Sequence, residues 1–73
     1  MKNIYNPKIS DLVYWYDPWK NLVGIGLIFA IENHWIKLIE NSNLELILVP
    51  GYNIDKVDNY NSIEEFKKNQ LIR

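Results

Sequence analysis

One stretch of the sequence is hydrophobic on both sides of an extended chain. Residues 22–32 read LVGIGLIFAIE. Successive side chains of a strand point to opposite faces, so the odd-numbered residues from Val23 to Ile31 share one face and the even-numbered residues from Gly24 to Ala30 share the other. Neither face can be fully solvated. This pattern predicts a strand that curves through a small barrel, with the glycines allowing a bend and close backbone approach.

A helix is the competing interpretation of the same residues. Two glycines inside a helix would cost about 1 kcal/mol each. The strand is therefore favoured for residues 22–32.

Short hydrophobic runs separated by turn residues predict the rest of a sheet. The runs are DLVYWY at 11–16, WIKLIE at 35–40 and LELILV at 44–49, with a short fifth strand near 54–57. The connections DPWKN, ENH, NSN and Pro50-Gly51 are rich in turn-forming residues. Residues 62–70 change to a helical period, and Ser62 with Glu65 matches a capping box. The sequence predicts a mainly β fold of four to five antiparallel strands with one C-terminal α-helix.

The chain is predicted to form one domain. Its 73 residues are divided into an N-terminal arm at 1–9 and a small barrel at 10–73. The absence of Cys rules out disulfides, and a single His cannot make a zinc centre alone. Alternation within the predicted strands places eight residues in the core: Val13, Trp15, Ile25, Leu27, Ile36, Leu38, Leu46 and Leu48.

Charge and hydropathy argue against nucleic acid and a membrane as partners, and against secretion. The net charge is −1 and the basic residues are scattered, so electrostatics disfavours binding to nucleic acid. No run reaches the roughly 18 apolar residues of a membrane span, and the N-terminus lacks the apolar segment of a secretory signal. We expect neither secretion nor membrane insertion.

Four aromatic residues fall within the stretch YWYDPWK at 14–20. Strand alternation predicts that Trp15 points inward, whereas Tyr14, Tyr16 and Trp19 face a protein partner, since Tyr and Trp dominate binding hot spots. Trp35 is assigned to the same protein-binding class. Two alternatives stay open: the rings are core and ordinary surface, or the helix face at Ile63 and Phe66 covers some of them.

The sequence offers no catalytic constellation. Gly24-x-Gly26 lies within a strand without a following helix, so it fails the context of a phosphate loop. His34 falls in a turn, and Asp55 and Asp58 fall in a loop, where solvation explains them. We predict no catalytic residues, no metal site and no cofactor.

The segment SDLVYWY…GIGLIFAIENHWIKLI…LILVP resembles the small SH3-like barrel proteins that tailed phages encode. The resemblance covers roughly residues 10–57 and is carried by Asp11-Leu12-Val13, by Gly24 to Ile28, and by the strand that ends near Pro50. It implies an SH3-like barrel and a non-enzymatic virion accessory role, such as capsid decoration or a neck, tail or baseplate fitting. The implied partners are virion subunits or further copies of the chain, and the implied location is the virion or the host cytoplasm.

A weaker resemblance is to KOW-type barrels. Gly26-x-Ile28-x-x-Ile31 fits the KOW motif, although no basic residue lies between positions 21 and 36. This resemblance implies an adaptor or regulator that binds a host or viral protein machine. Weak nucleic-acid binding is a third possibility.

Overall fold

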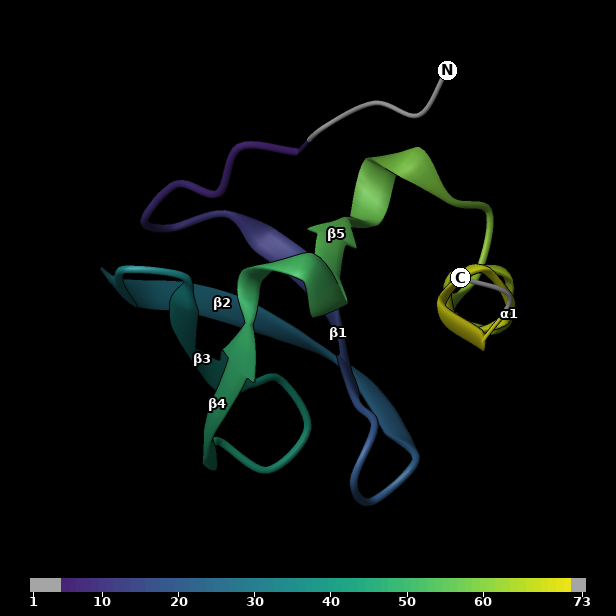
Figure 1. Ribbon diagram of the computed structural model, residues 1–73, viewed down its shortest axis with the longest axis horizontal. Helices are drawn as coiled ribbons and strands as arrows, with labels where there is room; N and C mark the ends of the chain where they lie inside the picture. Colours follow the sequence, from purple (N-terminus) through teal and green to yellow (C-terminus); the bar gives the residue numbers. More distant parts are fainter. Residues whose placement is uncertain (1–4, 72–73) are drawn as a thin grey trace.

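Five strands form one antiparallel sheet that curls around a hydrophobic interior (Figure 1). The computed structural model describes residues 5–71. The sheet order is β4-β3-β2-β1-β5. The elements are β1 (Leu12–Asp17), β2 (Leu22–Glu32), β3 (Trp35–Glu40), β4 (Leu46–Pro50), β5 (Ile54–Lys56) and α1 (Ile63–Leu71), with short 3₁₀ turns at Gly51–Asn53 and Val57–Asn59. The predicted mainly β class with a C-terminal helix is confirmed.

Most element bounds agree with the sequence prediction. β2 and β3 occupy the predicted residues, and α1 begins one residue later than expected. The hydroxyl of Ser62 accepts a hydrogen bond from the Glu65 N–H at 3.2 Å, as a helix N-cap does. β4 begins at Leu46 instead of Leu44, because Leu44 adopts a φ of 60° and its N–H bonds to the Glu40 carbonyl at 2.8 Å.

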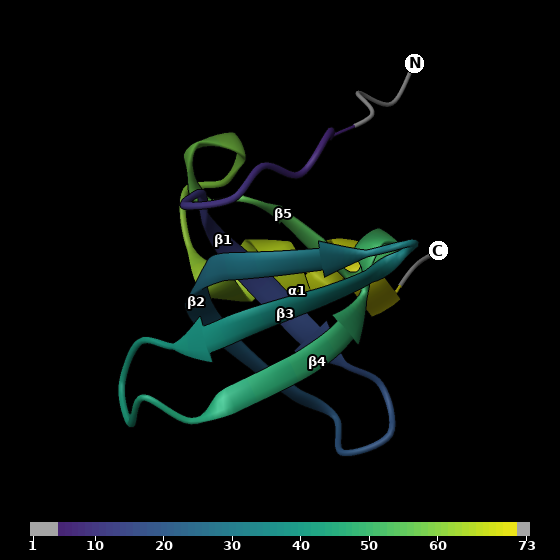
Figure 2. The same ribbon diagram turned by 90° about the vertical axis from the view of Figure 1, so that its left-hand side faces the viewer.

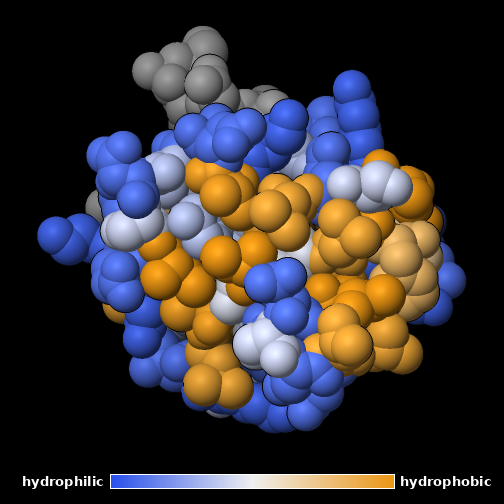
Figure 3. Space-filling model, turned by 180° about the vertical axis from the view of Figure 1, so that it is seen from behind, coloured by the Kyte–Doolittle hydropathy of each residue, from blue (hydrophilic) through white to orange (hydrophobic). Residues whose placement is uncertain are grey.

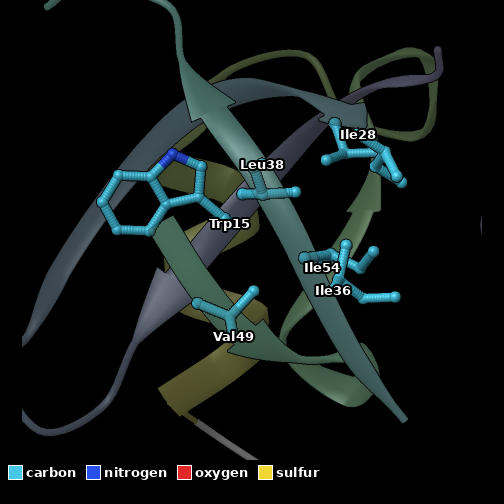
Figure 4. Close-up of a cluster of buried hydrophobic side chains, with 7 residues drawn as sticks. Trp15, Ile28, Ile36, Leu38, Val49 and Ile54 are labelled. Atoms are coloured by element: carbon cyan, nitrogen blue, oxygen red, sulfur yellow. The ribbon is translucent and has the colours of Figure 1, made fainter. Parts of the chain in front are cut away.

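The barrel interior contains one cluster of buried side chains, and Figure 4 shows six of them by name. Trp15 fills one end, Leu38 lies between, and Ile28, Ile36 and Ile54 lie toward the other end. Four of the eight predicted core residues lie in this cluster. Its members are Val13, Trp15, Ile28, Ile36, Leu38, Val49 and Ile54.

The inward face of β2 is the opposite of the one predicted. Trp15 lies across the sheet from Gly24, and Val13 lies across from Gly26, so both glycines face the interior. A Cβ atom on Gly24 would lie only 2.6 Å from the Trp15 ring. The barrel therefore needs its smallest residues where the indole packs, and Ile25 and Leu27 point outward.

A β-bulge changes the alternation within β2. Ile28 pairs with Leu38, but the next pair joins Ala30 to Lys37, so Phe29 is an extra residue. Simple alternation predicted that Ala30 shares a face with Ile28. Because of the bulge, Ala30 does not continue the inward face of Ile28. Phe29 is left exposed at the bulge.

The predicted faces of β4 are also wrong. Ile47 lies across from Leu38 and Val49 lies across from Ile36, so these two side chains turn inward. Leu46 and Leu48, which were predicted to be core residues, point outward and are exposed. The pairing with β3 decides the orientation, because both faces of β4 are equally hydrophobic.

A second core lies outside the barrel, between α1 and the outer side of β1 and β2. Phe66 of α1 is fully buried against Tyr14 and Tyr16. Half-buried residues surround these three: Val23, Ile25, Val57, Tyr60 and Ile63. Figure 2 shows β2, β3 and β4 toward the viewer and α1 behind them. The helix therefore covers only part of the outer surface of the sheet.

The described part of the N-terminal arm is fixed by one aromatic side chain. Tyr5 packs against the interior cluster, and its hydroxyl donates a hydrogen bond to the Asp11 carboxylate. Burial raises the pKa of Tyr5 well above its usual range, and the bond to Asp11 raises the pKa further. Residues 1–4 of the predicted arm lie outside the described residues.

Candidate functional site

The four predicted protein-binding residues do not form one surface. Tyr14 and Tyr16 are buried beneath α1 in the same chain, which corrects the expectation that they face a partner. Trp19 lies in the β1–β2 turn with an exposed fraction of 73%, and Trp35 begins β3 and is partly exposed. Because the turns beside Trp19 and Trp35 lie at opposite ends of β2, these two rings share no patch.

The structure leaves another part of the sheet uncovered. Residues directly opposite one another in neighbouring strands share a face. The pairings Leu12–Leu27, Leu27–Ile39 and Ile39–Leu46 therefore place four aliphatic side chains in one row across β1, β2, β3 and β4. All four point away from the barrel interior. With neighbouring strands about 4.8 Å apart, the row spans roughly 14 Å.

A second row extends this surface toward the β2–β3 turn. Lys37 lies across from Leu48, and the bulge places Phe29 beside them. Phe29, Lys37, Leu46, Ile47 and Leu48 line a shallow hollow of about 340 Å³. Trp35 has the same outward orientation as Lys37, two residues along β3. We call these outward residues the outer apolar face: Leu12, Leu27, Phe29, Trp35, Ile39, Leu46 and Leu48.

The outer apolar face is exposed to a degree that is unusual for aliphatic side chains. The exposed fractions are 71% for Leu46 and 54% for Leu48. Figure 3 shows the molecule from behind, where β2 lies, with a broad hydrophobic area that only a few hydrophilic side chains interrupt. Contiguous apolar patches on a monomer mark interaction sites. The one charge within the face, on Lys37, forms an ion pair with Glu32 at 2.9 Å.

A second polar feature lies at one end of the barrel. Glu40 is buried, and the Trp15 indole N–H donates to its Oε2 at 3.0 Å. The Ser42 N–H and hydroxyl both donate to its Oε1, at 2.7 and 2.6 Å. Burial alone would raise the pKa of Glu40, but the hydrogen bonds from Ser42 and Trp15 outweigh it and hold the pKa below its ordinary value.

These contacts give Glu40 a structural role. Its carboxylate ties the β3–β4 turn to the interior tryptophan, and a Cβ on Gly24 would collide with Oε2. Glu40 and Trp15 line a pocket of about 250 Å³ that also borders Lys20, Asn43 and Ile47. The contacts of the carboxylate with Trp15 and Ser42 serve the fold, so this pocket is a weaker candidate for a functional site than the exposed sheet surface.

Acid should destabilise the protein through Glu40. A carboxylate whose pKa is lowered by folding contributes stability that is fully present above the ordinary value of 4.5 and is lost as pH falls through the lowered pKa. Urea unfolding from pH 7 to pH 2 measures this loss, with Glu40→Gln as the comparison. The variant should be less stable at pH 7 and should lose less stability on acidification. An equal loss in both proteins would assign the acid sensitivity to other carboxylates.

The remaining candidates from the sequence are solvated or serve local structure. His34 is exposed in the β2–β3 turn. Asp55 accepts hydrogen bonds from Asn59 at 2.7 Å and Tyr60 at 2.9 Å, which organise the loop before α1, and Asp58 is exposed. Within residues 5–71, no three His, Cys, Asp or Glu side chains are placed to hold a metal ion.

No protein-family model, curated protein or solved structure shows a significant match to the chain. Across the described residues, no helix is long and apolar enough to cross a membrane. The resemblances to phage barrels and KOW barrels therefore rest on the quoted residues alone.

Sequence reasoning missed most of the outer apolar face. It assigned Leu27, Leu46 and Leu48 to the core and searched for binding residues among the aromatics. The available signal was the glycine pair of β2. If Trp15 packs inward, its cross-strand neighbour must be small, which turns Gly24 inward and Leu27 outward.

Proposed function

We propose that the protein is a non-enzymatic structural or interaction component, and that the outer apolar face binds a protein partner. The observation that supports this proposal is that α1 covers only one part of the outer surface of the sheet. The helix α1 buries Tyr14 and Tyr16 and partly covers Ile25 at one part of this surface, while the neighbouring row from Leu12 to Leu46 has no cover among the described residues.

The partner class follows from the chemistry of the face. It is almost entirely aliphatic and aromatic, and its single cation is already paired with Glu32. Nucleic acid requires unpaired positive charge, whereas the buried centre of a protein interface is apolar and poor in charge. The face therefore favours a protein surface with complementary apolar side chains.

The resemblance to phage barrels supports a finer proposal, in which the partner is a virion subunit and the protein is a virion accessory component. The alternative is an adaptor that binds a host or viral protein machine. Mass spectrometry of purified particles separates the two proposals. A constant stoichiometric copy number in particles supports the virion role, whereas presence only in the lysate of producing cells supports the adaptor.

One substitution tests the face directly. Leu27→Lys should keep the domain folded to within about 1 kcal/mol, because the position is 43% exposed and the lysine stem replaces the leucine side chain. Association with the particle or isolated partner should weaken at least tenfold, because the new charge would be buried at the interface. Co-sedimentation or calorimetry with the partner measures this change.

The matched control is Leu22→Lys. Leu22 lies in the same strand and is similarly exposed, at 51%, but it sits at the β1–β2 turn outside the outer apolar face. This variant should associate like the unchanged protein. Equal binding by both variants and the unchanged protein would exclude the face as the binding surface.

A further inference from the structure

Within residues 5–71, one edge of the strand β4 pairs with no other strand. This strand ends the sheet, and its pairing with β3 determines which backbone groups point outward. The Gly51 N–H bonds to the His34 carbonyl at 2.7 Å and the Glu40 N–H bonds to the Glu45 carbonyl at 2.8 Å. The odd-numbered residues of β4 therefore bond to β3, since hydrogen-bonded pairs alternate in an antiparallel ladder.

The even-numbered residues of β4 direct their backbone groups away from the sheet. Leu46 and Leu48 each present one N–H and one carbonyl, while Pro50 presents a carbonyl and no N–H. A free edge of this kind is a template for pairing with another strand. Natural edges are commonly protected by charged side chains or proline. At this edge the exposed outward side chains are Leu46 and Leu48, and the buried Pro50 ends the strand.

We propose that a second copy of the chain pairs with this edge, so that two β4 strands run antiparallel about a two-fold axis. This inference rests on the proposed function, because it names a partner for one border of the outer apolar face. The predicted register places Leu46 opposite Leu48 of the second copy.

Side-chain pairing selects this register. With Leu46 opposite Leu48 of the second copy, all four edge leucines face another leucine, and the outward N–H and carbonyl groups of Leu46 and Leu48 form four hydrogen bonds between the copies. A register centred on Leu48 would also form four hydrogen bonds, because the Leu46 N–H could donate to the Pro50 carbonyl of the other copy. That register, however, would place Leu46 opposite Pro50, which lacks an N–H, and only the two Leu48 side chains would face each other.

Side chains and charge also suit a second copy. In the predicted register the row of Leu12, Leu27, Ile39 and Leu46 continues into the row of Leu48 and Lys37 of the other copy, because Leu46 lies opposite Leu48. The net charge of −1 gives little repulsion between copies, and an isologous contact closes after two subunits. A stable interface needs roughly 800 Å² from each partner, about a sixth of the 5158 Å² surface of this chain. The edge alone is smaller, so the dimer should depend on concentration.

Light scattering after size-exclusion chromatography tests the dimer, from micromolar to millimolar protein. We expect the apparent mass to rise from one copy to two. Leu48→Lys should hold the protein monomeric, because each lysine would lie against Leu46 of the other copy and the two lysines would occupy diagonal positions on one face. Leu22→Lys should dimerise normally. A monomer at all concentrations, or a dimer that survives Leu48→Lys, would overturn the proposal.

Cysteine cross-linking tests the register, and the chain contains no other cysteine. Directly opposed residues have Cα atoms about 5.5 Å apart, within the range for a disulfide, whereas diagonal residues lie about 7–8 Å apart. A mixture of Leu46→Cys and Leu48→Cys proteins should therefore cross-link several-fold faster than either protein alone. Fastest cross-linking by Leu48→Cys alone would overturn this register in favour of the one centred on Leu48.

The dimer and the proposed function can fail separately. If the protein stays monomeric but associates with the particle in a manner sensitive to Leu27→Lys, the dimer is wrong and the binding face stands. If the dimer forms and Leu27→Lys leaves association unchanged, the β4 edge is an interface and the wider face is not the partner site.

Discussion

Replacing Trp15 with alanine should lower the free energy of unfolding by about 3–5 kcal/mol, the range for removing a large buried aromatic side chain. The ring fills one end of the barrel interior and is 5% exposed. Alanine would leave a cavity over Gly24 and remove the indole donor from the buried Glu40 carboxylate. Native proteins have a free energy of unfolding of roughly 0.05–0.15 kcal/mol per residue. The loss would therefore remove much of the stability of a chain of 73 residues. Urea unfolding followed by circular dichroism measures it.

Two further variants separate packing from hydrogen bonding. Trp15→Phe retains a ring in the interior but removes the N–H, so it should cost less than alanine. If the bond to Glu40 contributes, Trp15→Phe combined with Glu40→Gln should cost less than the sum of the two single changes. A folded Trp15→Ala protein with unchanged stability would show that β1 turns its other face inward.

Alternation in the sequence predicted the strands well, but it predicted the faces only where one face was clearly polar or where an aromatic fixed the choice. The inward direction of Ile36 and Leu38 was predicted correctly because Lys37 marks the other face of β3. In β2 and β4 both faces are hydrophobic, so alternation alone does not distinguish inside from outside. The deciding information lay in the neighbouring strands, through the pairs Trp15–Gly24 and Leu38–Ile47.

The candidate site was hard to predict for a related reason. The aromatic stretch at 14–20 suggested a binding surface, and the sequence also allowed a helix with an apolar face at Ile63 and Phe66. The local sequence pattern does not indicate against which part of the sheet that helix packs. The structure places it over Tyr14 and Tyr16, so two of the predicted binding residues became a second core. Exposed leucines, which the sequence cannot distinguish from core leucines, form the candidate surface instead.

Phe66→Ala should also cost about 3–5 kcal/mol, because Phe66 is fully buried and forms the centre of the second core. Its ring stacks on Tyr14 with centroids 5.4 Å apart and meets Tyr60 edge-on at 5.4 Å. A helix of nine residues is too short to be stable alone. We therefore expect α1 to detach and unfold, with loss of its circular dichroism signal and of amide protection along Ile63–Leu71.

The response of the barrel to Phe66→Ala shows whether the two cores unfold together. Alternate residues of β1 serve both cores: Val13 and Trp15 face the interior, while Tyr14 and Tyr16 face α1. Because one strand anchors both, the amides of β1 should lose protection together with those of the helix. Ile63→Ala, at a half-buried position of the same helix, is the control and should cost distinctly less. If the helix melts while β1 keeps its full protection, the barrel is stable without its helical cover and the second core is an independent unit.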